Sequence, residues 1–253
     1  MKRILLLCLA IVLFATTAAA QKDQANKPWT EWTEKEAMKV LADSPWAQTQ
    51  KELTDSGSTG PTVTSAAQNG NGANMVMSDA AKNASESGQN VGSKNVSRTA
   101  VYNVSFLTAK PVRQAFIRLV ELQTSDTPEK VAERRTFIDK DFSEYIVVTL
   151  KLDGNDQKTL APIKQLLGAG TADTMKNLAY LERKDGKRLA LMDYRAPGPD
   201  HLGAKFVFPR TLDGKPFLDA NSGEVRIYLE INKTKLSRKF KVADMMYDGK
   251  LEY

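Results

Sequence analysis

The stretch EVRIYLEI, residues 224–231, alternates apolar and polar side chains without a break. Its odd-numbered residues, from Val225 to Ile231, are all aliphatic, whereas its even-numbered residues, from Glu224 to Glu230, are charged or, at Tyr228, aromatic. Because successive side chains of a strand point to opposite faces, this pattern predicts a strand with one face on a core and the other in solvent.

The same two-residue period extends to both sides of this strand. The segment at 178–195 predicts a hairpin that turns at Asp185-Gly186. KFVFPR at 205–210 predicts a strand that Pro209 places at an edge or an end, and KLSRKFKVADM at 235–245 continues the pattern. Upstream, VYNVSF at 101–106 and EYIVVTLKL at 144–152 predict two more strands, the second apolar enough to be central.

Helical spacing appears in three segments between these strands. Residues 111–122 carry apolar side chains at helical intervals after Pro111, and Thr127-Pro128 is typical of a helix start. A short helix is expected at 160–167. The fold class is therefore α+β: a mostly antiparallel sheet of five to seven strands with two or three helices on one face.

The chain divides into four parts by composition. The N-terminal residues 1–20 have the pattern of a signal peptide, and all three tryptophans lie in a helical arm at 21–53. A low-complexity Ser/Gly/Asn/Ala-rich stretch at 54–98 predicts a disordered linker, because it has too few apolar residues to bury. The α+β domain then occupies 99–253.

The arm, residues 21–53, contains one recognisable helix start. Thr33 and Glu36 form a capping-box pattern, and Pro45 limits the helix that follows. So short a helix is not stable alone in water, so we expect the arm to pack onto the 99–253 domain through its tryptophans. A partner-binding arm, with interaction residues Trp29, Trp32 and Trp46, is the alternative.

The signal-like segment predicts export to the periplasm or the extracellular space. Its apolar run is too short to cross a bilayer comfortably, so no transmembrane span is expected after cleavage before Gln21. Cleavage would remove Cys8, the only cysteine, and would lower the net charge from +6 to +4, because Lys2 and Arg3 are lost. That balance suits an anionic envelope component or another envelope protein as partner, and export argues against nucleic acid.

Metal and cofactor chemistry have little support in the sequence. The Asp-Gly pairs suit turns, and the one at Asp153 lacks the glycine and glutamate of a calcium-binding EF-hand loop. A single histidine, His201, leaves no set of histidine ligands for zinc. No phosphate-binding glycine loop is present. We therefore expect no cofactor and no metal.

His201 is the one candidate for a general base. Asp200 or Asp193 could orient it beside a serine nucleophile, as in a hydrolase. The chain has no Gly-x-Ser-x-Gly motif, and an exposed loop histidine is the simpler interpretation. Paired carboxylates acting on glycosides stay open, because their separation is spatial.

Cationic side chains supply the remaining interaction candidates. Arg113 and Arg118 lie on a helix and could bind carboxylates or phosphates, although a solvated helix face is the expected role. Lys235, Lys239 and Lys241 lie on one side of a strand, where a basic stripe either protects a sheet edge or meets an anionic partner.

Three segments carry a resemblance. ADSPWAQT at 42–49, VYNVSFLTAKPVRQAF at 101–116 and FKVADMMYDGKLEY at 240–253 resemble uncharacterised exported bacterial proteins that have an N-terminal Trp/Ser-Pro-Trp-Ala arm. The similarity covers most of the mature chain outside the linker. These motifs are capping, turn and packing signals, so the resemblance implies membership but no catalytic residue.

The function expected from these observations is an exported, non-enzymatic binding or structural module of a bacterial envelope. The alternative is a secreted hydrolase that uses His201 with Asp193 or Asp200. A pocket holding His201 beside a serine hydroxyl would favour the enzyme. A flat or grooved basic sheet face would favour the binding module.

Overall fold

The computed structural model describes residues 27–54 and 97–253. The predicted signal peptide, 1–20, lies outside the described residues, and so does the predicted linker apart from its two ends. Within the described residues, no helix combines the length and the apolar run that crossing a bilayer requires.

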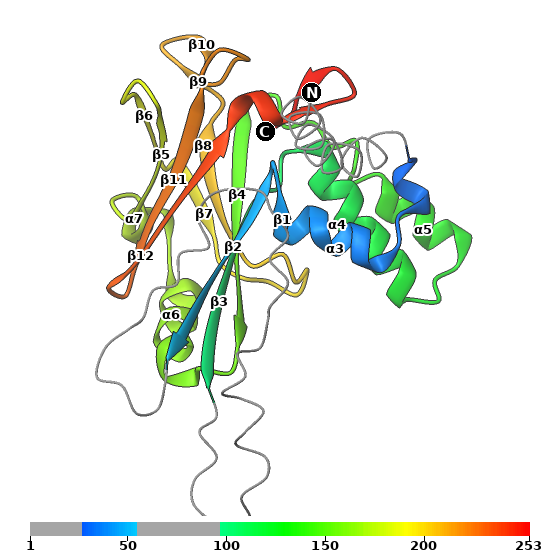
Figure 1. Cartoon of the computed structure of the whole chain (residues 1–253), viewed down its shortest axis with the longest axis horizontal. Helices are drawn as coiled ribbons and strands as arrows, with labels where there is room; N and C mark the ends of the chain where they lie inside the picture. The colour runs from blue at the N-terminus through cyan, green and yellow to red at the C-terminus, as the bar shows by residue number, and fades with distance from the viewer. Residues whose placement is uncertain (1–26, 55–96) are drawn as a thin grey trace, which may run out of the picture.

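The larger sheet has six antiparallel strands in the order β1-β2-β3-β4-β8-β7 (Figure 1). β4 lies inside this sheet, between β3 and β8, as its apolar sequence predicts. Five consecutive residues of β4, from Ile146 to Leu150, are therefore buried. The strands are β1 (Asp43–Ser44), β2 (Ala47–Thr54), β3 (Arg98–Phe106), β4 (Tyr145–Gly154), β8 (Ala204–Pro209) and β7 (Asp193–Arg195).

A second, four-stranded sheet has the order β12-β11-β5-β6. Its strands are β5 (Ala179–Arg183), β6 (Arg188–Ala190), β11 (Glu224–Ile231) and β12 (Thr234–Lys241). In β11 every odd-numbered residue is buried, which confirms the predicted alternation. The hairpin turn at Asp185-Gly186 is confirmed, because β5 pairs with β6. The chain leaves this sheet after β6, and β7, the last part of the predicted hairpin, pairs with β8 of the larger sheet. Two small hairpins pair β9 (Thr211–Leu212) with β10 (Lys215–Pro216), and β13 (Met246–Tyr247) with β14 (Lys250–Leu251).

The two sheets share one core. Phe106 of β3 and Phe240 of β12 meet edge to face with ring centroids 5.0 Å apart. Helix α6 (Gln157–Ala169) buries Leu160, Ile163 and Leu167 in the same core, and α7 (Ala172–Met175) follows it. The predicted helix at 160–167 is thus confirmed as part of α6.

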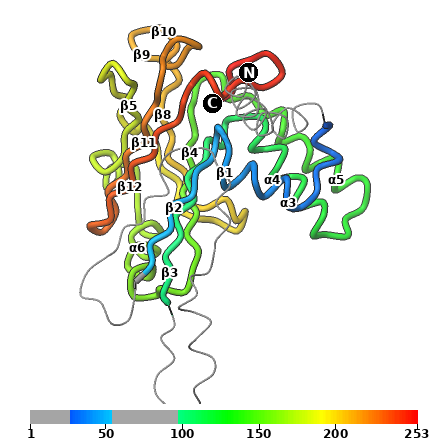
Figure 2. Tube along the Cα trace, in the orientation of Figure 1, coloured from blue at the N-terminus to red at the C-terminus, as the bar shows by residue number. Residues whose placement is uncertain are grey.

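The remaining helices lie on the other side of the larger sheet (Figure 1). They are η1 (Trp29–Glu31), α3 (Glu34–Ala42), α4 (Lys110–Gln123) and α5 (Pro128–Arg135); η4 (Val242–Asp244) follows β12. Figures 1 and 2 show the smaller sheet on one side of the larger sheet and α3, α4 and α5 on the other. The predicted α+β class with a mostly antiparallel sheet is confirmed. Helices α3, α4 and α5 share one face of that sheet, whereas α6 lies on the other face with the smaller sheet, which is an addition to the prediction.

The N-terminal arm is part of the larger sheet. After the capping box of Thr33 and Glu36 and helix α3, the chain forms β2, which pairs with β3 from Ala47↔Ser105 to Thr54↔Arg98. Thr54 is the last residue of β2 and Arg98 is the first residue of β3. The predicted linker, 54–98, therefore starts one residue too early and ends one residue too late. AQTQKELT has no apolar alternation, so no local pattern predicts β2.

The tryptophans pack as the docked-arm prediction requires. Trp32 and Trp46 are buried, at 3% and 8% exposure, and Trp29 is half-buried. The Trp46 indole donates a hydrogen bond from Nε1 to the Glu252 carbonyl over 2.8 Å, near the other end of the chain. Trp32 packs in a small cluster with Ala37, Val40 and Ala115, which joins α3 to α4.

Candidate interaction surface

The outer face of the smaller sheet is where the sequence-predicted basic stripe lies. The face is defined by the outward residues of its four strands, namely Tyr180, Glu182, Arg188, Ala190, Glu224, Arg226, Tyr228, Glu230, Lys235, Ser237, Lys239 and Lys241. Antiparallel register arranges them in rows across the sheet. We call this set the outer face.

An aromatic row crosses the middle of the outer face. Tyr180 of β5 lies opposite Tyr228 of β11, and the two rings stack with centroids 4.8 Å apart and planes 18° apart. The Arg188 guanidinium covers the Tyr180 ring at 4.4 Å from its centroid. Ala190 and Ser237, both small, stand at the two ends of the row. Stacking fixes the tyrosine pair in one arrangement.

Charged rows flank the tyrosines. Glu182 accepts a hydrogen bond from Arg188 Nε at 2.5 Å and lies 3.5 Å from Arg226 Nη1. The hydrogen bond to Glu182 raises the pKa of Arg188. The Tyr228 hydroxyl donates to Glu230 Oε2 over 2.8 Å, and this bond raises the pKa of the phenol. The carboxylate thus holds the edge of the Tyr228 ring in place.

The three predicted lysines all point outward from β12. Lys235 and Lys239 reach carboxylates only at 4.0 Å, in pairs with Glu230 and Glu224, and their side chains are 65% and 56% exposed. Exposed pairs this long contribute little, typically about 0–1 kcal/mol. Counting the whole face, five cations stand against three carboxylates, so it carries a net positive charge.

The edge of β12 is partly covered by the larger sheet. Gln48 of β2 donates to the Lys239 carbonyl over 2.7 Å, and Arg238 donates to the Gln50 side chain over 2.9 Å. Arg238 points inward, away from the three lysines, because it falls on the opposite alternation of the strand. Edge protection therefore comes at least in part from β2, which leaves the lysines available for another role.

The two arginine candidates of α4 serve the fold. Arg113 is buried, donates from Nη1 to the Thr108 carbonyl over 2.8 Å and lies 4.9 Å from the Phe142 ring centroid. Burial lowers its pKa. The expected solvated position is wrong for Arg113, because its end of α4 packs against the sheet. Arg118 donates from Nε to the Trp32 carbonyl over 2.7 Å, so it ties the arm to α4.

The three tryptophans that were candidates for partner binding also make contacts within the fold. Trp32 and Trp46 are buried in the fold, and the Arg135 guanidinium lies 5.1 Å from the Trp29 ring centroid. Arg135 also makes two hydrogen bonds to Glu121, at 2.7 and 3.2 Å. The described arm therefore presents its tryptophans to its own domain.

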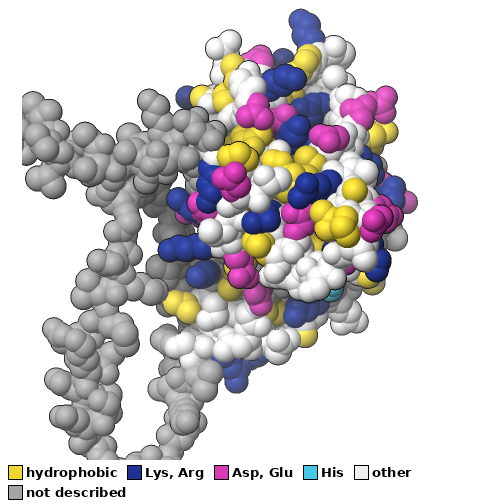
Figure 3. All heavy atoms as spheres, turned by 90° about the vertical axis from the view of Figure 1, so that its right-hand side faces the viewer, with side chains coloured by type: hydrophobic (Ala, Val, Ile, Leu, Met, Phe, Trp, Pro, Cys, Tyr) yellow, Lys and Arg dark blue, Asp and Glu magenta, His cyan; other side chains and the backbone are white. Residues whose placement is uncertain are grey.

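Figure 3 shows the helical side of the molecule, where charges of both signs are mixed with scattered apolar side chains.

Among the described residues, no hydrogen bond or ion pair joins His201 to Asp200 or Asp193, although His201 lies close enough to Asp200 to contribute to lowering the pKa of its carboxyl. His201 is exposed in a turn with φ of 58°, and its backbone N–H donates to Gly198. Asp200 pairs with Lys205 at 2.8 Å and Asp193 with Arg195 at 3.4 Å. Partial burial acts to raise the pKa of Asp200, but hydrogen bonds from Lys205 and the Leu202 N–H outweigh it, so the pKa lies below its ordinary value. Both carboxylates are thus committed to cations.

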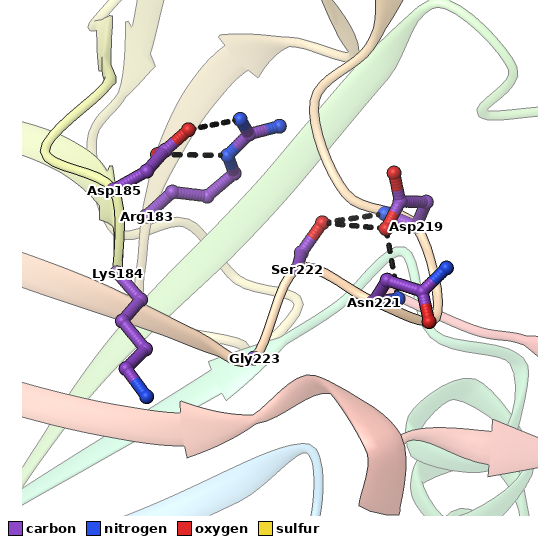
Figure 4. Close-up of a pocket in the computed structure, with 7 residues that line it drawn as sticks. All are labelled: Arg183, Lys184, Asp185, Asp219, Asn221, Ser222 and Gly223. Carbon is purple, nitrogen blue, oxygen red and sulfur yellow. Dashed lines mark hydrogen bonds and ion pairs between the residues drawn. The ribbon is translucent and has the colours of Figure 1, made fainter.

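A shallow hollow of about 390 Å³ lies beside the β5–β6 turn (Figure 4). Arg183 there makes a two-pronged contact with Asp185, which lowers the pKa of that carboxyl to about 2. Asp219 accepts hydrogen bonds from Asn221 N and the Ser222 hydroxyl, as in an ordinary turn. In residues 27–54 and 97–253, no group of three or more potential ligands could hold a metal ion.

In comparisons with known proteins, no family model, no curated protein and no solved structure matches the chain. The outer face therefore has to be interpreted from its own chemistry.

Proposed function

We propose that the protein is a non-enzymatic binding module of a bacterial envelope and that the outer face of its smaller sheet contacts an anionic envelope component. The observation that carries the proposal is the basic stripe of Lys235, Lys239 and Lys241 beside a fixed tyrosine pair. Export of the chain, on which the envelope location depends, is part of the same proposal.

The charge arrangement supports an anionic partner. Lys235 and Lys239 are exposed and reach their carboxylates only at 4.0 Å, so an incoming anion displaces weak contacts. Strand β12 is the outermost strand of its sheet, and although β2 covers part of its edge, the Lys235 and Lys239 side chains are 65% and 56% exposed. Clustered charge of one sign raises the local concentration of counter-ions and accelerates association.

The test compares two variants with the same change in net charge. Lys235→Gln/Lys239→Gln/Lys241→Gln removes the stripe, and the control Lys35→Gln/Lys39→Gln/Lys130→Gln removes three exposed lysines from α3 and α5. Binding of the chain without its predicted signal segment is measured on immobilised dextran sulfate, with neutral dextran as blank.

The stripe variant should bind about 100-fold more weakly, since each lysine near an anionic surface contributes about 1 kcal/mol. The control should change binding far less, and added salt should weaken the wild type. Equal losses in both variants would mean that net charge alone acts, and no binding of the wild type to any anionic surface would refute the proposal.

A further inference from the structure

We propose that the anionic component is an acidic glycan: one sugar ring stacks on Tyr228, and carboxylates of the chain lie on Lys235 and Lys239. This inference rests on the proposed function and specifies its ligand. It is carried by the juxtaposition of a single available ring face, two separated cations and three carboxylates on the outer face.

The tyrosine pair offers one ring face. Arg188 covers one side of Tyr180, whose other side stacks on Tyr228. Beyond Tyr228 the row ends at Ser237, and among the described residues no further ring or guanidinium stacks on that side. The small serine leaves the Tyr228 ring facing β12. Aromatic faces are electron-rich and attract the C–H groups that a sugar ring presents on its flat side.

The two cations flank this position along the strand. Lys235 and Lys239 are each two residues from Ser237 and point to the same side. Two residues of a strand span about 6.6 Å, so the cations lie on the order of 13 Å apart on either side of the ring. A polymer that runs along β12 with a ring on Tyr228 therefore places neighbouring units beside a lysine in each direction.

The carboxylates of the outer face distinguish between anionic polymers. Glu224 and Glu230, whose side chains are 40% and 41% exposed, only accept hydrogen bonds, which the hydroxyl groups of a sugar donate. Glu182 is already paired with Arg188 and Arg226. Polyphosphate has no hydroxyl groups to donate, so these acceptors favour a sugar polymer over polyphosphate. Single-stranded nucleic acid also depends on stacking of successive bases, and one ring face provides a single position.

The ring is held ready before a ligand arrives. The hydrogen bond from the Tyr228 hydroxyl to Glu230 and the stack on Tyr180 fix it on two sides. A side chain that is already ordered loses less conformational entropy on binding, so less of the free energy of its contact is offset.

The test uses oligogalacturonate, neutral oligogalactose, polyphosphate and single-stranded oligothymidylate as probes, with affinities from titration calorimetry. Wild type is compared with Tyr228→Ala, Tyr228→Phe and Lys235→Gln/Lys239→Gln. Tyr145→Ala is the matched control, because Tyr145 is an exposed tyrosine, 39% exposed, on the larger sheet. Circular dichroism and thermal unfolding verify that each variant is folded.

Oligogalacturonate should bind best, and Tyr228→Ala should weaken it by about 10-fold, the scale of one aromatic contact. Tyr228→Phe, which keeps the ring, should stay within about 3-fold, and Tyr145→Ala should have no effect. The lysine variant should weaken binding of oligogalacturonate and leave oligogalactose unchanged.

Two outcomes overturn the inference and leave the proposed function standing. One is unchanged affinity of Tyr228→Ala for oligogalacturonate, which would mean binding by charge alone. The other is tighter binding of polyphosphate or oligothymidylate than of oligogalacturonate. Absence of binding to every anionic probe would instead refute both proposals.

Discussion

At the scale of single residues, arginine and lysine have different tasks in this protein. Arginines join segments that are far apart in the chain: Arg118 reaches the Trp32 carbonyl, Arg210 the Tyr253 carbonyl and Arg183 the Phe217 carbonyl. The planar guanidinium donates several hydrogen bonds in fixed directions, which suits such joints. The lysines of β12 make only long contacts, so the freely available positive charge of the outer face is mainly lysine charge.

One residue-scale prediction concerns the carboxylate that caps α3. Glu36 accepts hydrogen bonds from the Lys27 ammonium at 2.8 Å and from the Thr33 N–H at 2.7 Å, and these contacts lower its pKa to about 2. A lowered folded-state pKa means that the contribution to stability is complete above the ordinary value of 4.5 and is lost as the pH falls toward 2.

Glu36→Gln should therefore lower the free energy of unfolding at pH 7, by less than about 1 kcal/mol because the site is exposed. The difference from wild type should shrink between pH 4.5 and pH 2. Urea unfolding at several pH values measures it, with Glu34→Gln, on the same helix turn, as control. A difference that is constant, or that grows toward acid pH, would contradict the assignment.

At the scale of elements, the sequence predicted those strands and helices whose apolar residues follow a regular local spacing. Strands β4 and β11 and helices α4 and α6 have regular apolar spacing, and each forms where the spacing placed it. β2 has no such pattern, because its stability comes from eight pairings with β3 across a long gap in sequence. Pairing of that kind is a tertiary property, which no local window contains.

The same limit applies to the outer face. Alternation alone predicted that Tyr228 and the three lysines point outward. It did not predict the stack, because Tyr180 meets Tyr228 only in the register that β5 and β11 adopt. His201 and its aspartates show the converse: residue types that suit catalysis were present, but the fold gave Asp200 and Asp193 other partners.

The pairing of β2 with β3 leads to a prediction about cleavage. A protease that cuts between residues 55 and 96, for example trypsin at Lys82 or Lys94, severs the chain between two strands that remain hydrogen-bonded. Burial of Trp32 and Trp46 adds apolar contacts to that ladder. The arm fragment and the C-terminal fragment should therefore elute together on gel filtration in native buffer and separate only in denaturant. Separation in native buffer would show that the arm is held weakly.

At the scale of the whole molecule, three layers depend on one another. The larger sheet packs its inner face on the smaller sheet, through contacts such as Phe106 with Phe240, and carries the helical layer on its other face. The arm contributes both to the sheet, as β2, and to the helical layer, as α3. If the arm detached, the larger sheet would lose strand β2 and the helical layer would lose helix α3 at the same time. We therefore expect the layers to unfold together.

Tryptophan emission tests that expectation, because all three tryptophans lie in the arm and none in residues 97–253. Emission therefore reports the arm alone, whereas far-ultraviolet circular dichroism reports both sheets and the helices. Native emission should be blue-shifted, since Trp32 and Trp46 are buried, and its red shift in urea should coincide with the loss of circular dichroism. Trp29→Phe, at the half-buried position, serves as a control and should leave the shared midpoint in place. An emission change that precedes the loss of circular dichroism would mean that the arm detaches first, and then β2 would have to be a replaceable strand at the border of an otherwise complete domain.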